Sequence, residues 1–264
     1  MALNLNRAWR SALFNVLENG SEVSPRGQRT RELLHSPLVV DMQYPVLTVK
    51  SRELNYRFMA AEAYWILTGR NTVKDIAPYN KNISQFSDDG ITFAGAYGPE
   101  IQRQLNFVVS KLAEDPDTRQ AVLTIWKQNP PPSKDIPCTV AMSFMIRDGW
   151  LHCHTFMRSN DLWLGTPYDV FNFSMLSTLI CARYNRSVKS IDQFIRPGFL
   201  YLTAASQHLY EQHWETAEKL DYFNLYELDV LPAQFYVGSR AEEVLLERLC
   251  QMRERGNESL RWWR

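Results

Sequence analysis

Residues able to do chemistry gather in one segment, Met157 to Phe173, which reads MRSNDLWLGTPYDVFNF. Its polar members stand around a turn-forming Gly-Thr-Pro sequence: Arg158, Ser159, Asp161 and Asp169. An amphipathic segment broken by a turn, with its charges in water, would look the same. The segment is therefore a candidate site whose weight depends on the rest of the chain.

Two further groups flank this segment. Pro137-Cys138 follows a proline-rich loop upstream, and His208-Leu209-Tyr210 lies downstream. A single cysteine at the start of a strand is usually an inert core residue. A nucleophilic role requires a lowered thiol pKa, and Arg158 on the next strand of the hairpin would supply the positive charge. A possible nucleophile, an anion-binding arginine and polar aromatic residues thus fall in one constellation.

Two other parts of the sequence contain candidate functional residues. Glu62 borders the apolar face of a helix on which Phe58 and Trp65 lie, and partial loss of water there would raise its pKa into the range of a general acid or base. The alternative is a glutamate at the edge of the polar face. The loop from 24 to 31 contains three arginines and suits phosphate capture, although solvated surface arginines would give the same pattern.

Composition narrows the function. The chain has 264 residues, 45% of them hydrophobic, and we expect a single domain over residues 1–264. Lys+Arg and Asp+Glu both total 29, which favours a small anionic ligand over nucleic acid or a membrane surface. The four cysteines lack metal-binding spacing, and His152 and His154 have no third ligand, so we expect no metal. Without a signal-like start, the expected location is the cytoplasm.

Periodicity alone indicates a mixture of helices and strands. Helical spacing marks four segments: Asn4–Glu18, Arg52–Leu67, Pro99–Glu114 and Val170–Tyr184. Strand signals mark five others, in pieces within 33–47, then at Ala121–Trp126, Cys138–Arg147, from Trp150 onward, and Phe194–Ala205. Asp148-Gly149 predicts a hairpin turn between two of these strands. In isolation, His208 and Tyr210 would be ordinary residues at a helix start.

Taken together, these motifs resemble the thymidylate synthase family. The resemblance rests on Pro137-Cys138, MRSNDLWLGTPYD and HLY in this order and at these separations, and on three further segments: AEAYWILTG from Ala61, GAYG from Gly95 and DPDTRQAVLTIW from Asp115. It runs from about Arg26 to Tyr210. It implies an α+β fold in which one large mixed sheet packs back to back against its twin in a homodimer, with helices on the other face.

The resemblance also implies a role for each matching residue. The catalytic group would comprise Cys138 as nucleophile, Glu62 ordering water, Asp169 reading the base and Tyr97 near the C5 proton. The nucleotide phosphate would bind Arg26, or its neighbour Arg29, together with Arg158, Ser159 and the partner subunit's Arg119, and the sugar would bind His208 and Tyr210. The folate side would include Asp161, Gly165, Ile83 and Trp65.

Three departures from the family pattern bear on substrate and product. Asp169 stands where thymidylate synthases carry asparagine, as in deoxycytidylate and cytidylate hydroxymethylases. Ile83 and Phe86 stand where two tryptophans line the folate pocket, which would let water reach the exocyclic methylene. Arg119-Gln120 retains one arginine of a family pair, so phosphate affinity would depend more on Arg26 and Arg158.

The expected function is a pyrimidine nucleotide C5 hydroxymethyltransferase. It would convert dCMP or CMP to the 5-hydroxymethyl nucleotide with 5,10-methylenetetrahydrofolate and water, as in phages that make modified DNA precursors. The alternatives are a hydride-terminated dCMP 5-methyltransferase, a CMP-specific hydroxymethylase, thymidylate synthesis, and a non-catalytic nucleotide- or RNA-binding dimer. The last has no need of Cys138, Glu62 and Asp169 together. The C-terminal tail does not resemble that of thymidylate synthases, so no role is transferred to it.

Overall fold

The computed structural model describes residues 4–220 and 237–255, and its framework is one seven-stranded mixed sheet. The strand order is β1-β2-β7-β5-β4-β3, with β6 pairing beside β7. Pairing is antiparallel except where β7 runs parallel to β5 and to β6. The strand bounds are β1 Ser21–Val23, β2 Thr30–Asp41, β3 Val122–Thr124, β4 Thr139–Arg147, β5 Trp150–Met157, β6 Asn160–Asp161 and β7 Arg196–Tyr210.

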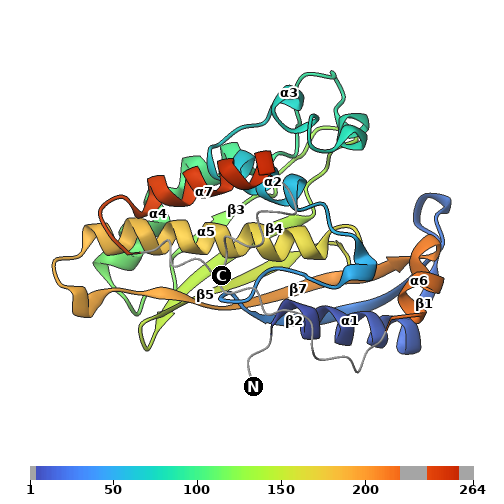
Figure 1. The fold of residues 1–264 in the computed structure, drawn as a ribbon, viewed down its shortest axis with the longest axis horizontal. Coiled ribbons are helices and arrows are strands. Elements are labelled where there is room, and N and C mark those ends of the chain that lie inside the picture. Colours follow the sequence, from blue (N-terminus) through green and yellow to red (C-terminus); the bar gives the residue numbers. More distant parts are fainter. Residues whose placement is uncertain (1–3, 221–236, 256–264) are drawn as a thin grey trace.

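Helices pack on the sheet and on one another. α5 crosses the middle of the molecule, with α2, α4 and α7 beside it and the long strand β7 running below it in Figure 1. α1 lies along β2. The helix bounds are α1 Leu5–Asn19, α2 Tyr56–Leu67, α3 Val73–Ile76, α4 Tyr97–Glu114, α5 Thr166–Ser187, α6 Trp214–Glu218 and α7 Ala241–Arg255. The expected α+β class with a large mixed sheet is therefore present.

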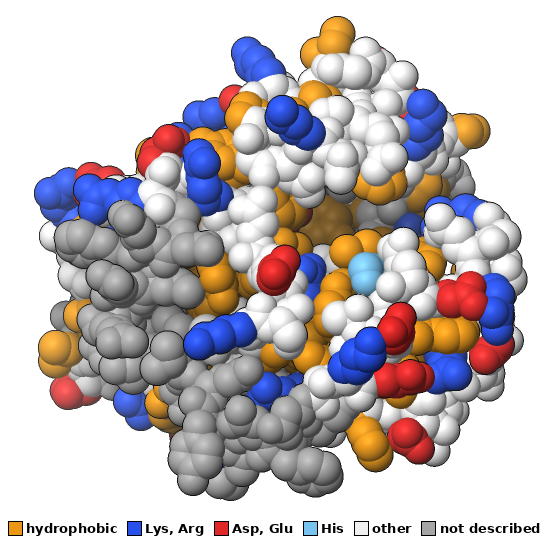
Figure 2. All heavy atoms as spheres, turned by 45° about the vertical axis from the view of Figure 1, so that its right-hand side comes forward, with side chains coloured by type: hydrophobic (Ala, Val, Ile, Leu, Met, Phe, Trp, Pro, Cys, Tyr) orange, Lys and Arg blue, Asp and Glu red, His pale blue; other side chains and the backbone are white. Residues whose placement is uncertain are grey.

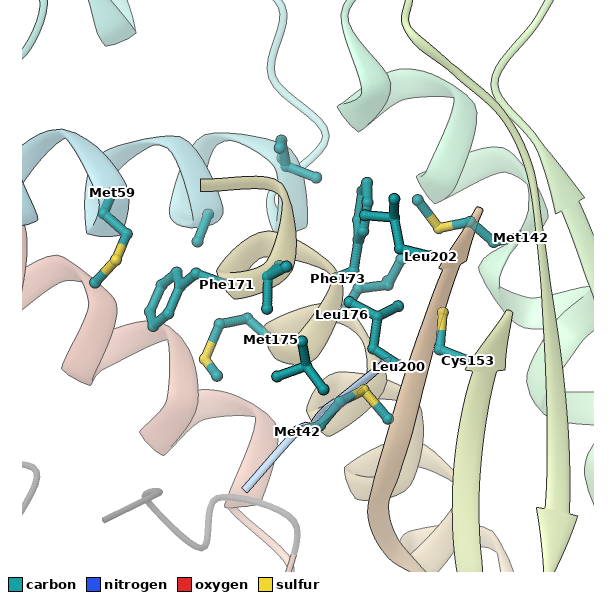
Figure 3. Packing of buried hydrophobic residues seen from close by; sticks show 14 of the residues in the cluster. Met42, Met59, Met142, Cys153, Phe171, Phe173, Met175, Leu176, Leu200 and Leu202 are labelled. Carbon is teal, nitrogen blue, oxygen red and sulfur yellow. The ribbon is translucent and has the colours of Figure 1, made fainter. Parts of the chain in front are cut away.

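The hydrophobic core lies between α5 and the sheet. Phe171, Phe173 and Leu176 of α5 point toward side chains of neighbouring elements, among them Leu200 and Leu202 of β7 (Figure 3). Nearly every turn of α5 is buried, since the helix is covered by α2, α4 and α7 as well as by the strands. This burial fixes the start of α5, and with it the turn that carries Asp169.

Several expected boundaries differ from those in the structure. The 33–47 region forms one continuous strand, β2, up to Asp41, because it pairs with β7 along almost its whole length. β7 continues past Ala205 to Tyr210, so His208 and Tyr210 lie at a strand end and not at a helix start. The hairpin turn is confirmed: Asp148 and Gly149 both have positive φ, 52° and 76°, as in a type I′ turn.

The sheet face away from α5 carries a row of rings. His154 stacks on Tyr201 with ring centroids 4.6 Å apart, and His152 lies parallel to Phe199 at 5.9 Å. Phe156 is 45% exposed on the same strand as the two histidines. This is the face on which the resemblance places the homodimer contact, and that contact stays a prediction, as does the single domain. Among the described residues, no helix is long and apolar enough to cross a membrane.

We predict that the packing of α7 on α2 contributes substantially to stability. Leu249 of α7 is fully buried, so Leu249→Ala should lower the free energy of unfolding by about 2 to 5 kcal/mol through lost burial and a cavity. Urea denaturation measures this loss. The matched control is Ile191→Ala, where the side chain is 72% exposed and the expected change is under about 0.5 kcal/mol. Equal effects of the two substitutions would contradict the packing.

Candidate active site

A cavity of about 1130 Å³ lies between the loop after β1, the end of β7 and the Lys81–Phe86 turn. Figure 2 shows the hollow, with hydrophobic side chains visible at its bottom. The lining residues come from five parts of the chain. They include Arg26, Gly27 and Arg29; Arg52, Asn55 and Phe58; Ile83 and Phe86; Asp161, Gly165 and Tyr168; and Tyr210. Segments far apart in sequence thus form one binding space.

Arg158 holds the loop that delivers Cys138. Its guanidinium donates to the carbonyls of Pro137 and Ile136, at 3.0 and 2.8 Å, and its main-chain N–H donates to the Cys138 carbonyl at 2.8 Å. Within the described residues, these side-chain bonds go to neutral carbonyls and not to a carboxylate, so the positive charge stays available. The predicted proximity of Arg158 to Cys138 is confirmed.

The expected depression of the Cys138 pKa is not found. Burial raises the pKa of the thiol, and although Arg158 lowers it, Asp169 and other acids act in the opposite direction. The net shift is upward because the loss of water around a thiolate outweighs one nearby guanidinium. These surroundings therefore favour the protonated thiol.

Glu62 lies in the middle of α2, facing α5. Its Oε2 accepts a hydrogen bond of 2.7 Å from Nδ2 of Asn172, one turn beyond Asp169 on α5. Burial raises the pKa of Glu62 from 4.5 to about 7, and the Asn172 bond only partly offsets it. The side chain keeps slight contact with solvent. A carboxyl that exchanges its proton near neutrality suits acid-base work, as expected from the sequence.

Asp169, in the first turn of α5, lies against the cavity wall. A Cβ added to Gly165, which lines the cavity, would come within 3.3 Å of Asp169 Oδ2. Burial raises the pKa of Asp169 well above its usual range, and the charges of Glu62 and Asp161 add to this. Oδ2 accepts a hydrogen bond of 3.1 Å from Nδ2 of Asn160. The surroundings therefore favour the neutral acid.

Tyr97 joins the same group. Its hydroxyl accepts a hydrogen bond of 3.1 Å from the main-chain N–H of Thr139, the residue after Cys138. Burial raises the pKa of Tyr97, and the charges of Asp169 and Cys138 raise it further. The four residues expected to do catalysis, Cys138, Glu62, Asp169 and Tyr97, are thus linked by hydrogen bonds or electrostatic interaction within one region.

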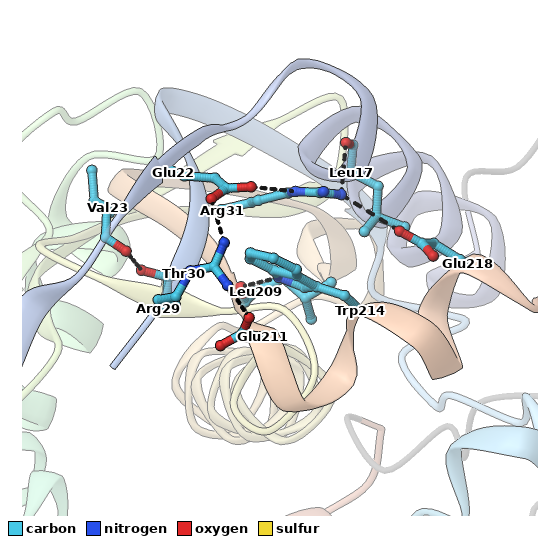
Figure 4. Close-up of polar contacts among 10 residues, drawn as sticks. All are labelled: Leu17, Glu22, Val23, Arg29, Thr30, Arg31, Leu209, Glu211, Trp214 and Glu218. Atoms are coloured by element: carbon cyan, nitrogen blue, oxygen red, sulfur yellow. Dashed lines mark hydrogen bonds and ion pairs between the residues drawn. The ribbon is translucent and has the colours of Figure 1, made fainter. Parts of the chain in front are cut away.

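The arginines of the 24–31 loop have different roles in the structure. Arg26 is exposed at the cavity rim, with its backbone and that of Gly27 in the left-handed region. Arg29 lies between Glu22 and Glu211 and pairs with both (Figure 4). Arg26 is therefore the better phosphate candidate of the two. Ser159 is half-buried beside Arg158, whereas Arg119 is exposed in the turn before β3, outside the cavity lining, and its role across a dimer stays a prediction.

The sugar and folate candidates divide into those at the cavity and those elsewhere. Tyr210 lines the cavity and contacts His208 edge to face, with ring centroids 5.1 Å apart. Asp161, Gly165 and Ile83 line it as well. Asp161 Oδ1 also accepts from the N–H groups of Trp163 and Leu164, which holds the turn before α5. Trp65 packs in the core against Phe93 and is not among the lining residues.

Sequence reasoning missed two asparagines. Asn160 binds Asp169 and Asn172 binds Glu62, so each carboxyl of the pair has its own amide partner. The signal for Asn172 was its spacing of three residues from Asp169 on a helix, which puts both on one face. Asn160 sat inside the polar motif, but only the tertiary structure shows that it faces Asp169.

Comparison with known proteins decides the family. A profile described as thymidylate synthase matches residues 7–222, most of the chain. The chain belongs to the thymidylate synthase family. The match ends before α7, so that helix lies outside the part the family profile describes. Members of this family use methylenetetrahydrofolate and typically form dimers.

A relative within the family comes from Bacillus phage SP01 and is named deoxyuridylate hydroxymethyltransferase. It is 37% identical over 178 residues, which is 58% of this chain and 45% of the relative. The aligned region thus spans less than half the length of that phage protein. Its name pairs hydroxymethyl transfer with a uracil nucleotide, whereas Asp169 in the place of the family asparagine predicts a cytosine nucleotide.

We predict a pH dependence of stability from the Glu62 pKa. Between about pH 4.5 and 7 the folded protein holds a proton on Glu62 that the unfolded chain has lost, so stability falls as pH rises through this window. Glu62→Gln cannot titrate and keeps an acceptor for Asn172. The wild type should lose on the order of 3 kcal/mol relative to this variant between pH 4.5 and 7.5, measured by urea denaturation. A constant difference would contradict the raised pKa.

Proposed function

We propose that this protein transfers a one-carbon unit to C5 of a cytosine nucleotide and completes the reaction with water, giving a 5-hydroxymethyl nucleotide. The observation that carries the proposal is the desolvated carboxyl of Asp169 at the base-reading position, beside the acid-base carboxyl Glu62. The hydroxymethyl ending is supported by the name of the phage relative.

The chemistry of Asp169 supports cytosine as the base. A neutral carboxylic acid has one donor and one acceptor, and the cytosine edge has an acceptor at N3 and a donor at the amino group. The acid can therefore donate to N3 and accept from the amino group. As a nucleophile adds to C6, negative charge develops on the ring, and transfer of the Asp169 proton to N3 would neutralise it. The raised pKa of Asp169 in the resting site thus serves the reaction and does not oppose it.

Cys138 supplies the nucleophile. Its sulfur would add to C6 and make C5 electron-rich, while the thiol proton must leave the site. Because burial raises the pKa of the thiol, deprotonation would accompany binding of the base, with Arg158 stabilising the thiolate. Tyr97 would lie near the C5 proton that leaves after the new carbon bond forms. Elimination of the Cys138 sulfur would finally restore the aromatic ring.

The cavity is suited to a second, folate ligand. Methylenetetrahydrofolate supplies a carbon at the oxidation level of formaldehyde, and the lining residues Asp161, Gly165 and Ile83 would hold it beside the nucleotide. A volume of about 1130 Å³ exceeds the roughly 300–1,000 Å³ typical of a site for one small molecule. Gly165 leaves the space next to Asp169 that a side chain would fill.

Water is the proposed final reactant. Asn172 Nδ2 is bound to Glu62, and Asn172 Oδ1 is buried without a hydrogen-bond partner among the described residues. A water bound by Glu62 and Asn172 Oδ1 would satisfy that acceptor and give its proton to Glu62 as its oxygen attacks the methylene carbon. Ile83 replaces a large indole at the wall, which would leave room for this water.

The phosphate and sugar contacts complete the proposal. Arg26 and Arg158 would bind the nucleotide phosphate, with Arg119 of the partner subunit as a third cation in a homodimer. Ser159 would add a hydroxyl, and His208 with Tyr210 would contact the sugar. Arg26 is exposed on a left-handed turn at the cavity rim, which supports its guanidinium as a contact for the phosphate.

A second candidate is hydroxymethylation of a uracil nucleotide. The phage relative is named for that substrate. Its name therefore supports a hydroxymethyl product on uracil and not on cytosine. A neutral Asp169 has a donor that can reach the uracil O4, so discrimination between the bases depends on which carboxyl oxygen carries the proton. Turnover with each nucleotide separates the two candidates.

We predict that the purified protein, given methylenetetrahydrofolate, adds CH₂O to dCMP or CMP, as measured by mass spectrometry. Cys138→Ser should abolish product, because the serine hydroxyl is a far weaker nucleophile. Asp169→Asn should lower cytosine nucleotide turnover at least about ten-fold and raise dUMP turnover, because the amide matches the uracil edge. Wild-type turnover of dUMP alone would reject the cytosine assignment, and unchanged activity of Cys138→Ser would reject covalent catalysis.

We also predict that the residue at position 83 controls the ending of the reaction. Ile83→Trp should place an indole against the methylene carbon, exclude water and increase the share of CH₂ product, with the folate as hydride donor. The same mass spectra measure the ratio of the two products. Phe86→Trp, on the 47% exposed neighbour, is the matched control and should change the ratio less. An identical product ratio in Ile83→Trp and wild type would remove Ile83 from the water argument.

A further inference from the structure

A chain of three buried or half-buried polar side chains lies behind the cavity wall at the start of α5. The Thr166 hydroxyl lies 2.6 Å from Asn160 Oδ1, and Asn160 Nδ2 lies 3.1 Å from Asp169 Oδ2 and 3.6 Å from the Met157 sulfur. Thr166 is fully buried and Asn160 is 1% exposed, so water does not compete for these contacts.

The distances fix the direction of the Asn160 amide. A separation of 2.6 Å is typical of an O–H···O hydrogen bond, whereas 3.1 Å is typical of N–H···O. The amide oxygen therefore faces Thr166 and the amide nitrogen faces Asp169. The Asn160 nitrogen also lies 3.6 Å from the Met157 sulfur, which is a weak acceptor. In a reversed amide, the Asn160 oxygen would face this sulfur, which has no hydrogen to donate to it.

This arrangement makes Asp169 Oδ2 an obligatory acceptor. When Asp169 is neutral, a proton on Oδ1 leaves Oδ2 as the carbonyl oxygen, which is the better acceptor for the Asn160 amide. Burial and the nearby charges of Glu62 and Asp161 raise the Asp169 pKa and favour that neutral form. A free carboxylic acid could carry its proton on either oxygen, but this one presents a single pattern of donor and acceptor.

The two bases present opposite edges to such a group. Cytosine has an acceptor at N3 and a donor at C4, whereas uracil has a donor at N3 and an acceptor at C4. An acid with a mobile proton matches both, and an acid with a fixed proton matches only one. We propose that Asn160, oriented by Thr166, is a specificity-determining positioning residue that holds the Asp169 proton on Oδ1 and so restricts the enzyme to one base.

This inference rests on the proposed function, because it assumes transfer to C5 of a pyrimidine nucleotide. It does not depend on which of the two bases the enzyme prefers. The measurement is the ratio of kcat/KM for dCMP and dUMP, together with Kd values for both nucleotides by calorimetry. Asn160→Ala should bring this ratio closer to one by about ten-fold or more, because the proton becomes mobile and the disfavoured base gains a partner. A merely structural role would lower turnover of both nucleotides equally.

Matched substitutions at Thr166 test the same chain without touching Asn160. Thr166→Val keeps the shape but removes the hydroxyl that orients the amide, and should shift the ratio in the same direction, whereas Thr166→Ser keeps the hydroxyl and should retain the wild-type ratio. Thr178→Val removes another buried hydroxyl of α5, bonded to Ser174, and should leave the ratio unchanged. Thermal unfolding shows which variants are folded, and Thr166→Val carries the test if Asn160→Ala is not.

The outcomes separate the two proposals. If the wild type prefers dUMP and the substitutions still narrow the ratio, the cytosine assignment fails and the role of Asn160 stands. If the wild type prefers dCMP and folded Asn160→Ala and Thr166→Val keep the full ratio, the role of Asn160 is overturned and the proposed function stands. A wild type that binds none of dCMP, CMP and dUMP overturns both.

Discussion

The loss of water around two carboxyls, Glu62 and Asp169, is the constraint on which the site depends. They lie on the packed helices α2 and α5, and burial raises both pKa values because a charged carboxylate is poorly solvated there. Two ionised carboxylates would also repel each other, so the pair favours a state with at least one proton. The surroundings thus favour a protonated carboxyl, which the proposed chemistry requires as a proton donor.

That arrangement explains why each carboxyl has an amide partner and not a basic one. An arginine beside Asp169 would ionise it and remove the donor that a base edge needs, whereas Asn160 offers a hydrogen bond without charge. Asn172 does the same for Glu62. Positive charge is found instead near Cys138, on Arg158, and at the rim, on Arg26, where an anion would enter. Neutral carboxyls in the interior and arginines nearer the surface suit a nucleotide whose base lies deepest and whose phosphate lies at the rim.

Much of this site was readable from residue types, and the remainder needed the tertiary fold. Cys138, Glu62, Asp169 and Arg158 were singled out by residue type and by the family resemblance, and the structure brings them together. The upward shift of the Cys138 pKa was not readable, because it depends on how much protein surrounds the thiol. The roles of Asn160 and Asn172 depend on contacts between a strand and a helix or between two helices. Trp65 was expected at the folate side, but it lies on the apolar face of α2 and packs in the core.

The C-terminal helix α7 shows how the fold supports a site from outside the family's common part. It begins after residue 222, where the thymidylate synthase profile ends, and it packs against α2, the helix of Glu62. Glu242 of α7 pairs with Arg183 of α5 at 2.6 Å, and Glu254 accepts from the Tyr79 hydroxyl at 2.9 Å. Tyr79 precedes Asn80 of the cavity wall. One helix thus contacts both carboxyl-bearing helices and the residue beside the cavity wall, so its packing helps to set the positions of Glu62 and Asp169.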